Sequence, residues 1–252
     1  MSFGVIYVAT GKSYIDEACQ SAASLKDKMP NTKITIFSSQ MVKSPFFDEV
    51  VIIRKPQYDY VDKILPIANS PYKHTLFLDT DTYLCDDISE IFTLLERFDI
   101  AVAHEPWRRE GINYEAIGDE IPPSFPEMNT GVILFKKSPK VSLLFREWLK
   151  IYQASMSKKV KPRHDQPAFR EALFKSELRV ATLTPEYNCR FIFPVFVGGL
   201  AEVKILHGRY PELSAVAKEL NSKKEARVFT KWSISDASRY SDRVAPLLEL
   251  TH

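Results

Sequence analysis

A short apolar run that ends in two aspartates limits the folds open to this chain more than any other feature. Residues 75–84 read TLFLDTDTYL, and the apolar residues 76–78 follow one another without polar interruption. Such a run is typical of a strand that is covered on both faces, as in a parallel sheet with helices on each side. Asp79 and Asp81 follow at the point where the chain leaves that sheet.

Strand-like and helix-like segments alternate along the first hundred residues. Apolar or β-branched runs predict strands at residues 3–9, 33–37, 50–53, 76–78 and 100–104. The segments predicted to be helices are residues 14–28, 60–68 and 88–97. This alternation predicts an α/β fold with a doubly wound, mostly parallel sheet flanked by helices. Ligands of such sheets bind at the carboxyl ends of the strands, where Asp79 and Asp81 are expected.

The second half of the chain is less regular. Residues 105–127 contain four prolines and two glycines, and predict a long loop that includes Trp107, Arg108 and Arg109. Strands are predicted at residues 131–136, 179–183 and 203–206, and helices at residues 139–154 and 167–174. We expect the loop and the basic segment 158–163 to shape the choice of a binding partner.

The composition argues against several classes of protein. The 34 Lys and Arg residues nearly balance the 32 Asp and Glu residues, so the charge gives no indication of a nucleic-acid partner. Cys19, Cys85 and Cys189 are far apart and form no CxxC pair, which predicts reduced thiols in a cytoplasmic protein. The longest apolar stretch, at residues 191–201, is too short for a transmembrane segment.

The Asp79–Asp81 pair has two interpretations from the residues alone. In an extended chain both carboxylates point to the same side, where they repel each other. A divalent cation such as Mg²⁺ or Mn²⁺, which binds one or two carboxylates together with substrate phosphates, would relieve that repulsion. Alternatively, one aspartate caps the following turn and the other is solvated.

Six segments in order along residues 3–211 resemble those of the retaining nucleotide-sugar glycosyltransferases of family eight, which include glycogenin and bacterial galactosyltransferases. The segments are YVATGKSYIDEA, DKI followed by FLDTDT, EMNTGVILFKKS, HDQPAF, LTPEYN and KILHG. Each segment alone is a weak signal, but the six in this order are specific. The resemblance implies a GT-A-type fold and the transfer of a hexose from a nucleotide-diphosphate sugar, with a UDP-sugar as donor and retention at the anomeric carbon.

The resemblance also implies one domain over residues 1–252. Residues 1–104 would form a nucleotide-binding half, residues 105–211 a donor-sugar and acceptor half, and residues 212–252 a C-terminal helix and tail. The acceptor, whether a glycan, a lipid-linked sugar or a protein, is not indicated.

Site residues follow from the same resemblance. Asp79, Asp81 and His207 would bind Mn²⁺ or Mg²⁺. The donor-binding residues would be Thr10, Gly11, Tyr14, Lys63, Asp79, Thr80, Asn129, Thr130 and Arg209. Asp165 and Gln166 would be catalytic. Asp165 would act either as the nucleophile that forms a covalent sugar–enzyme intermediate, or near the anomeric carbon while the acceptor attacks from the same face through a short-lived ion pair. The alternative for Asp165 is an N-cap of the helix that Pro167 begins.

The chain departs from the family at two places. HGRYPEL lacks the lysine that usually follows the late histidine and reaches the diphosphate, so we expect Arg209 to replace it. Gly11 stands where the family often has a polar residue, which leaves the nucleotide base open. Two alternative functions also remain at this point: a sugar-nucleotide or glycan-binding protein without turnover, and a nucleotidyltransferase, for which TGKSY supplies only one glycine and one lysine.

Overall fold

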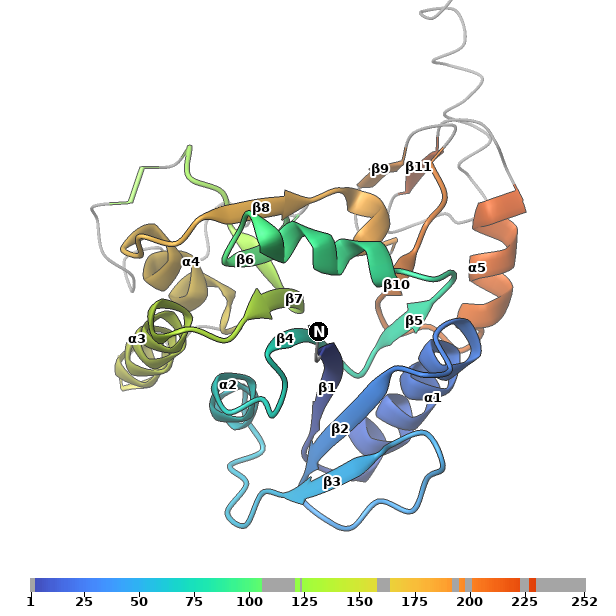
Figure 1. Ribbon diagram of the computed structural model, residues 1–252, viewed down its shortest axis with the longest axis horizontal. Helices are drawn as coiled ribbons and strands as arrows, with labels where there is room; N and C mark the ends of the chain where they lie inside the picture. Colours follow the sequence, from blue (N-terminus) through green and yellow to red (C-terminus); the bar gives the residue numbers. More distant parts are fainter. Residues whose placement is uncertain are drawn as a thin grey trace, which may run out of the picture.

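The computed structural model describes residues 3–105, 121–122, 124–157, 164–191, 195–197, 201–222 and 227–229. At its centre lies a seven-stranded sheet with the order β3-β2-β1-β4-β7-β6-β8 (Figure 1). The strands are β1 (Phe3–Ala9), β2 (Lys33–Ser38), β3 (Glu49–Ile52), β4 (His74–Leu78), β6 (Ile100–His104), β7 (Met128–Lys136) and β8 (Val180–Leu183). Only β7 runs antiparallel to its neighbours, β4 and β6, so the predicted α/β fold with a mostly parallel sheet is confirmed.

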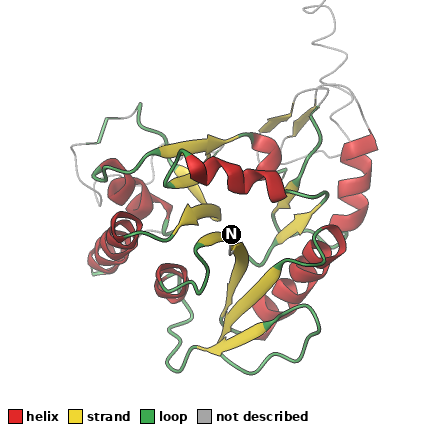
Figure 2. Cartoon of the chain, in the orientation of Figure 1, coloured by secondary structure: helices red, strands yellow, loops and turns green. Residues whose placement is uncertain are grey.

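Helices cover both faces of this sheet, as Figure 2 shows. The helix α1 (Lys12–Lys28) and the 3₁₀ helix η1 (Ser89–Glu96) pack on one face. On the other face lie α2 (Val61–Ala68), α3 (Pro139–Met156) and α4 (Gln166–Phe174). Strand β4 contributes to both apolar cores, since Leu76 and Leu78 join the α1 side and Phe77 joins the α2–α4 side. The uninterrupted apolar run of β4 therefore has the double burial predicted for it.

Several elements differ from the predictions. Residues 88–97 were expected as a helix and form the 3₁₀ helix η1, and the strand predicted at 131–136 begins three residues earlier as β7. The sequence also gave no sign of β5 (Thr82–Leu84), which is too short to show a period. The remaining elements are η3 (Pro185–Tyr187), β9 (Val195–Val197), β10 (Ile205–His207), α5 (Leu213–Ser222) and β11 (Arg227–Phe229).

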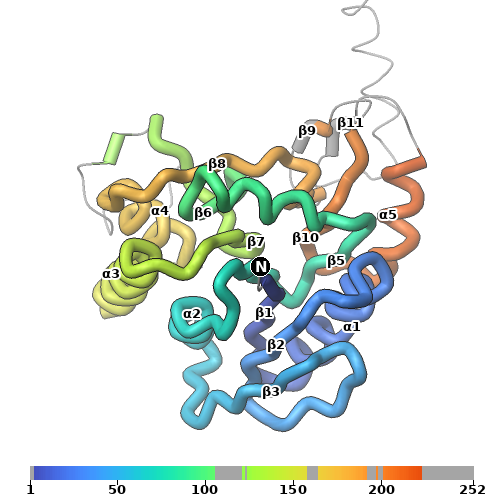
Figure 3. Tube along the Cα trace, viewed as in Figure 1, coloured from blue at the N-terminus to red at the C-terminus, as the bar shows by residue number. Residues whose placement is uncertain are grey.

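The pairing of β5 with β10 brings the late part of the chain back to the end of β4 (Figure 3). The two strands are antiparallel, and His207 lies opposite Thr82. The backbone amide of Gly208 donates to the carbonyl of Asp81 over 2.9 Å. This pairing places the late histidine beside the aspartates, although more than a hundred residues separate them in the sequence.

Some predictions fall on other parts of the chain. Trp107, Arg108 and Arg109 of the predicted loop, and the basic segment 158–163, lie outside the described residues, so their role in partner choice stays a prediction. Within the described ranges, no helix combines the length and apolar character that crossing a membrane requires.

Asp99 joins three strands of the sheet just before β6 begins. Its carboxylate accepts from the Arg179 amide over 2.9 Å and pairs with the Lys136 ammonium at 3.0 Å. Burial alone would raise the pKa of Asp99, but these two groups outweigh it and lower the pKa to about 2. Since the folded-state pKa lies below the ordinary value of 3.8, the ionised carboxylate stabilises the fold above about pH 4.

We therefore expect Asp99→Asn to lower the free energy of unfolding by about 1–2 kcal/mol near neutral pH, measured by urea denaturation. The difference in unfolding free energy between the variant and the wild type should shrink as the pH falls from about 4 towards about 2. The wild-type carboxylate is then protonated and neutral, like the asparagine amide. The matched control is Asp16→Asn, which removes an exposed ion pair with Lys12 and should leave stability unchanged. An equal effect of both substitutions would contradict the assignment.

Candidate metal and donor site

The backbone places two carboxylates just outside the sheet. Strand β4 ends at Leu78, and the amide of Asp79 still donates to the carbonyl of Gly131 on β7 over 2.7 Å. The hydroxyl of Thr82 then donates to the carbonyl of Asp79 over 2.8 Å, which holds the turn into β5. Asp79 and Asp81 therefore lie at the carboxyl end of a central strand, the edge predicted from the sequence.

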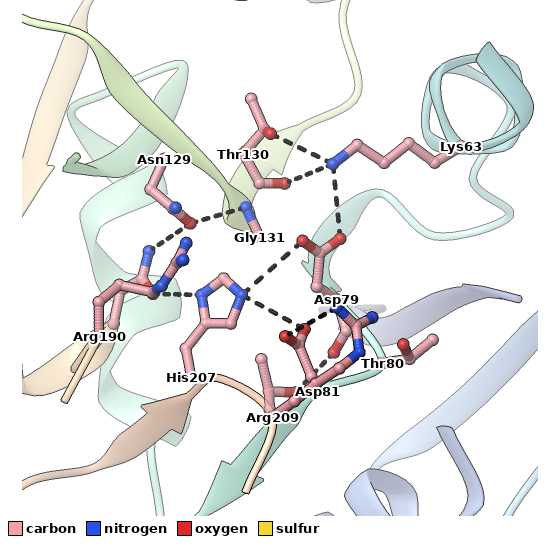
Figure 4. Close-up of polar contacts among 12 residues, drawn as sticks. Lys63, Asp79, Thr80, Asp81, Asn129, Thr130, Gly131, Arg190, His207 and Arg209 are labelled. Carbon is pink, nitrogen blue, oxygen red and sulfur yellow. Dashed lines mark hydrogen bonds and ion pairs between the residues drawn. The ribbon is translucent and has the colours of Figure 1, made fainter. Parts of the chain in front are cut away.

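His207 completes a three-residue cluster at this edge (Figure 4). Its Nε2 lies 3.4 Å from Oδ1 of Asp81 and 3.8 Å from Oδ2 of Asp79. One ligand atom from each residue can be chosen so that all lie within 4.8 Å of one another. Two carboxylates and one imidazole can hold a divalent cation and leave positions for phosphate oxygens. The structure thus brings together the three residues predicted to bind a metal.

Gly131 leaves the space in which this cluster forms. A Cβ atom at this position would lie 2.0 Å from Cε1 of His207 and 2.8 Å from Oδ2 of Asp79, closer than any real contact. The site therefore needs a glycine on β7. Our sequence analysis did not single out Gly131, although a glycine inside a predicted strand signals a close approach of another group.

The surroundings act in opposite directions on the two aspartates. Burial raises the pKa of Asp79, and the Lys63 ammonium opposes this only in part. Burial would also raise the pKa of Asp81, but the imidazole of His207 and the guanidinium of Arg209 outweigh it and hold that pKa well below its ordinary range. A bound cation would therefore stabilise the ionised form of Asp79 more than that of Asp81, because Asp79 has less compensation from the protein.

A second charged cluster adjoins the first. Nζ of Lys63, on α2, lies 3.1 Å from Oδ2 of Asp165 and 3.5 Å from Oδ1 of Asp79. The hydroxyl of Thr130 lies 3.1 Å from both carboxylate oxygens of Asp165. Burial alone would lower the pKa of Lys63, but the two carboxylates outweigh it and raise the pKa. Lys63 therefore remains an ammonium ion that links Asp79 to Asp165.

Asp165 occupies the N-cap position of α4, as one interpretation of the sequence predicted, but its side chain does not cap the helix. The carboxylate points instead to Lys63 and Thr130, and only its backbone carbonyl serves the helix, by accepting from the amide of Phe169. The predicted position was therefore right and the predicted side-chain cap wrong, because the buried ammonium is a stronger partner than the backbone amides.

Both clusters open into one cleft of about 430 Å³. Eleven of the predicted site residues line it: Thr10, Tyr14, Lys63, Asp79, Thr80, Asp81, Thr130, Asp165, Gln166, His207 and Arg209. Gly11 and Asn129 are not among its lining residues. Gly11 directly precedes α1 with a φ of 103°, a conformation that favours glycine, and Asn129 is buried behind the cleft.

Arg209 is held at the mouth of the cleft by a residue that the sequence analysis missed. Glu17, on α1, accepts from Nε of Arg209 over 2.8 Å and from the Thr80 hydroxyl over 2.7 Å. The hydrogen bond to Glu17 and the charge of Asp81 raise the pKa of Arg209. The guanidinium also lies over the ring of Tyr14, 5.3 Å from its centroid. A permanent cation thus stands beside the acidic cluster.

Four further residues were missed from the sequence: Arg190, which lines the cleft, and Glu105, Glu127 and Asn188, which do not line it. Their only signal was position, because Glu105 follows a predicted strand and Asn188 belongs to the LTPEYN segment. Glu105, Glu127 and Asn188 hold the amides of Asn129 and Gln166 through hydrogen bonds of 2.8–3.0 Å. Arg190 forms an ion pair with Glu105 at 3.6 Å.

Comparisons with known proteins bear on this site. A family model described as nucleotide-diphospho-sugar transferase matches residues 72–221. The search of curated proteins gives no significant match.

Solved structures share the fold at low identity. An active-site mutant of LgtC has a TM-score of 0.58 at 14% identity, over 82% of this chain and 88% of that one. The galactosyltransferase LgtC, in complex with donor and acceptor sugar analogues, has a TM-score of 0.55 at 13% identity, over 96% and 95%. The glycosyltransferase GlyE of Streptococcus pneumoniae TIGR4 has a TM-score of 0.60 at 16% identity, over 97% of this chain and 64% of that one. These findings confirm the GT-A-type fold and the resemblance drawn from the sequence.

The space at Gly131 gives a direct test of the cluster. We expect Gly131→Ala to weaken Mn²⁺ binding by about tenfold or more, because the added methyl group displaces His207 from Asp79. Isothermal calorimetry of the purified chain measures this. The control is Val132→Ala, the next residue of β7, which is fully buried in the α1-side core. It should lower stability by about 2 kcal/mol and leave Mn²⁺ affinity unchanged. Unweakened binding in Gly131→Ala would exclude a metal site between these residues.

Proposed function

This chain belongs to the nucleotide-diphospho-sugar transferase family, which makes it a glycosyltransferase, and we propose that it transfers a hexose from a UDP-sugar with Mn²⁺ or Mg²⁺ and with retention. The observation that carries this proposal is the meeting of two charged clusters at Asp79. One is the candidate metal cluster, and the other is the Lys63–Asp165 pair. Both face a single cleft of a size that suits a sugar nucleotide.

The metal cluster would hold the donor's diphosphate. Asp79, Asp81 and His207 would bind the cation, which supplies charge compensation for the leaving nucleoside diphosphate. Arg209 carries a permanent positive charge 3.8 Å from Asp81, so it is placed to donate hydrogen bonds to the same phosphates. In this proposal it takes the place of the family's lysine. Tyr14, on the first turn of α1, would offer its half-exposed ring to the base.

Asp165 would face the donor sugar from the other end of the cleft. Its side chain is only 2% exposed, and its carboxylate is occupied by the Lys63 ammonium and the Thr130 hydroxyl. A carboxylate held by such partners is a weaker nucleophile than a free one, but it still stabilises positive charge nearby. This arrangement favours a same-face attack beside an oxocarbenium-like centre over a covalent sugar–enzyme intermediate.

The two halves of the chain would each contribute residues to the site. Residues 1–104 supply Tyr14, Lys63 and the two metal-binding aspartates, and residues 105–211 supply Asp165 and His207. LgtC has been solved with donor and acceptor sugar analogues, and by analogy the acceptor here would approach the donor sugar in the same cleft. The acceptor class remains a glycan, a lipid-linked sugar or a protein.

Donor hydrolysis tests the proposal. UDP-, GDP- and ADP-sugars are offered to the purified chain with Mn²⁺ or with EDTA, and the released nucleoside diphosphate is measured. We expect Mn²⁺-dependent release from a UDP-sugar, and a fall of about 100-fold or more in Asp81→Asn, which loses one metal ligand. Asp81→Asn should remain folded because the residue lies outside the core, although the loss of its ionised contacts with His207 and Arg209 should lower stability. Wild-type release in this variant would refute metal dependence, and binding of UDP and Mn²⁺ without any turnover would favour a binding protein.

A second substitution tests the role of Asp165. We expect Asp165→Asn to lower transfer by about 10²–10³-fold, while the Kd for UDP changes by less than about threefold, because in this proposal the residue would face the sugar rather than the nucleotide. Kinetics on the preferred donor and UDP binding by calorimetry measure the two effects. A large loss of UDP affinity would instead assign Asp165 to nucleotide binding. Glu171→Gln, a buried carboxylate later in α4, is the control for folding.

A further inference from the structure

A row of buried polar side chains lies behind the metal cluster. It runs from Glu105, at the end of β6, through Asn129 on β7 and Asn188 after η3 to His207 at the end of β10. All four residues are less than 7% exposed. Each neighbouring pair is joined by a hydrogen bond of 2.7–3.0 Å. The row therefore connects the buried carboxylate of Glu105 to the imidazole of the cluster.

The direction of the hydrogen bonds is fixed at Asn129. Its Nδ2 donates to Oε2 of Glu105 over 2.8 Å, and its Oδ1 accepts from the backbone amide of Gly131 over 2.9 Å. An ionised carboxylate can only accept, and a backbone N–H can only donate. The amide of Asn129 therefore fits in one orientation, with oxygen towards Gly131, as Figure 4 shows.

That orientation passes to Asn188 and then to the ring of His207. Oδ1 of Asn129 also accepts from Nδ2 of Asn188 over 3.0 Å, so the carbonyl oxygen of Asn188 faces the imidazole. This oxygen lies 2.7 Å from Nδ1 of His207. Since a carbonyl oxygen only accepts, Nδ1 must carry the hydrogen, and in the neutral ring Nε2 then presents its lone pair to Asp79 and Asp81.

The backbone keeps Asn188 in register with the ring. The amide of Cys189, the next residue, donates to the carbonyl of Ile205 over 2.8 Å, and the amide of His207 donates to the carbonyl of Cys189 over 2.9 Å. Without Asn188, the nearby carboxylates would attract the ring proton to Nε2, since Oδ1 of Asp81 lies only 3.4 Å away. A proton on Nε2 would exclude a metal from that atom.

We propose that Asn188 is a positioning residue that holds His207 as the Nδ1–H tautomer and so keeps Nε2 available to a divalent cation. Asn129 and Glu105 orient Asn188 for this task. The inference rests on the metal site of the proposed function, but the tautomer itself can be observed without any metal.

Two substitutions of Asn188 separate this role from simple structural support. Asn188→Leu removes both the acceptor for Nδ1 and the donor to Asn129. Asn188→Asp keeps an acceptor at Nδ1 but loses the donor to Asn129, so it should also lower stability. Both variants disturb the row of hydrogen bonds, but only the leucine variant removes the acceptor that keeps the hydrogen of His207 on Nδ1. The control is Asn221→Leu, which removes two hydrogen bonds to Val203 at a distance from the cluster.

The first measurement is a long-range ¹H–¹⁵N spectrum of the metal-free full chain at alkaline pH, where imidazole is neutral. The chain has five histidines, and the His207 signals are assigned by their loss in His207→Gln. We expect an Nδ1–H ring in the wild type and in Asn188→Asp, and a shift towards Nε2–H in Asn188→Leu. An Nε2–H ring in the wild type, or an unchanged ring in Asn188→Leu, would overturn the proposal.

The second measurement is Mn²⁺ affinity by calorimetry. Asn188→Leu should bind about 10–100-fold more weakly, and Asn188→Asp and Asn221→Leu should stay within about threefold of the wild type. An equal loss of Mn²⁺ affinity in the two Asn188 variants would indicate that Asn188 has only a structural role, and would contradict the proposal. A wild type that shows the expected tautomer but binds no Mn²⁺ would refute the metal site of the proposed function and leave the positioning role intact.

Discussion

Three carboxylates meet at the carboxyl end of β4, and the negative charge that they concentrate must be balanced within the protein. Asp79 stands in the middle, with Asp81 on one side and Asp165 on the other. Lys63 lies between two of them, and Arg209 approaches the third. Residues 76–78, the part of β4 that adjoins the aspartates, are apolar and buried, so they offer no polar side chain to balance this charge. The placement of cations around this edge therefore governs the rest of the site.

The backbone around this edge is shaped to keep the carboxylates close. Strand β7 runs antiparallel beside β4, and Gly131 leaves room there for the imidazole of His207. The short β5–β10 pair fixes the turn after Asp81 from the other side. Rigid elements thus hold the mutually repelling carboxylates close together even when no ligand is bound. A site that cannot relax in this way is pre-organised for a ligand of opposite charge.

Polar groups behind the cleft and polar groups in the cleft have different tasks. Those in the cleft include the charged groups of Lys63, Asp79, Asp81, Asp165 and Arg209, which face the space that a ligand would fill. Those behind it are amides and a buried carboxylate that satisfy one another, as in the contacts of Asn129 with Glu105 and Asn188. Fully satisfied buried networks are rigid, so they can fix the orientation of the residues in front of them.

The sequence by itself determined the strands of the sheet, because burial on both faces leaves an apolar run such as that of β4. It also indicated Asp79 and Asp81 by their position at the end of a strand, and Lys63, Asp165 and His207 through the resemblance to the family-eight glycosyltransferases. Only the tertiary structure decided which of them touch. The β5–β10 pairing, the space at Gly131 and the orientation of Asn188 depend on contacts between residues far apart in the chain. Local periodicity carries no trace of such contacts, since three-residue strands and single amides acquire their geometry from their neighbours in space.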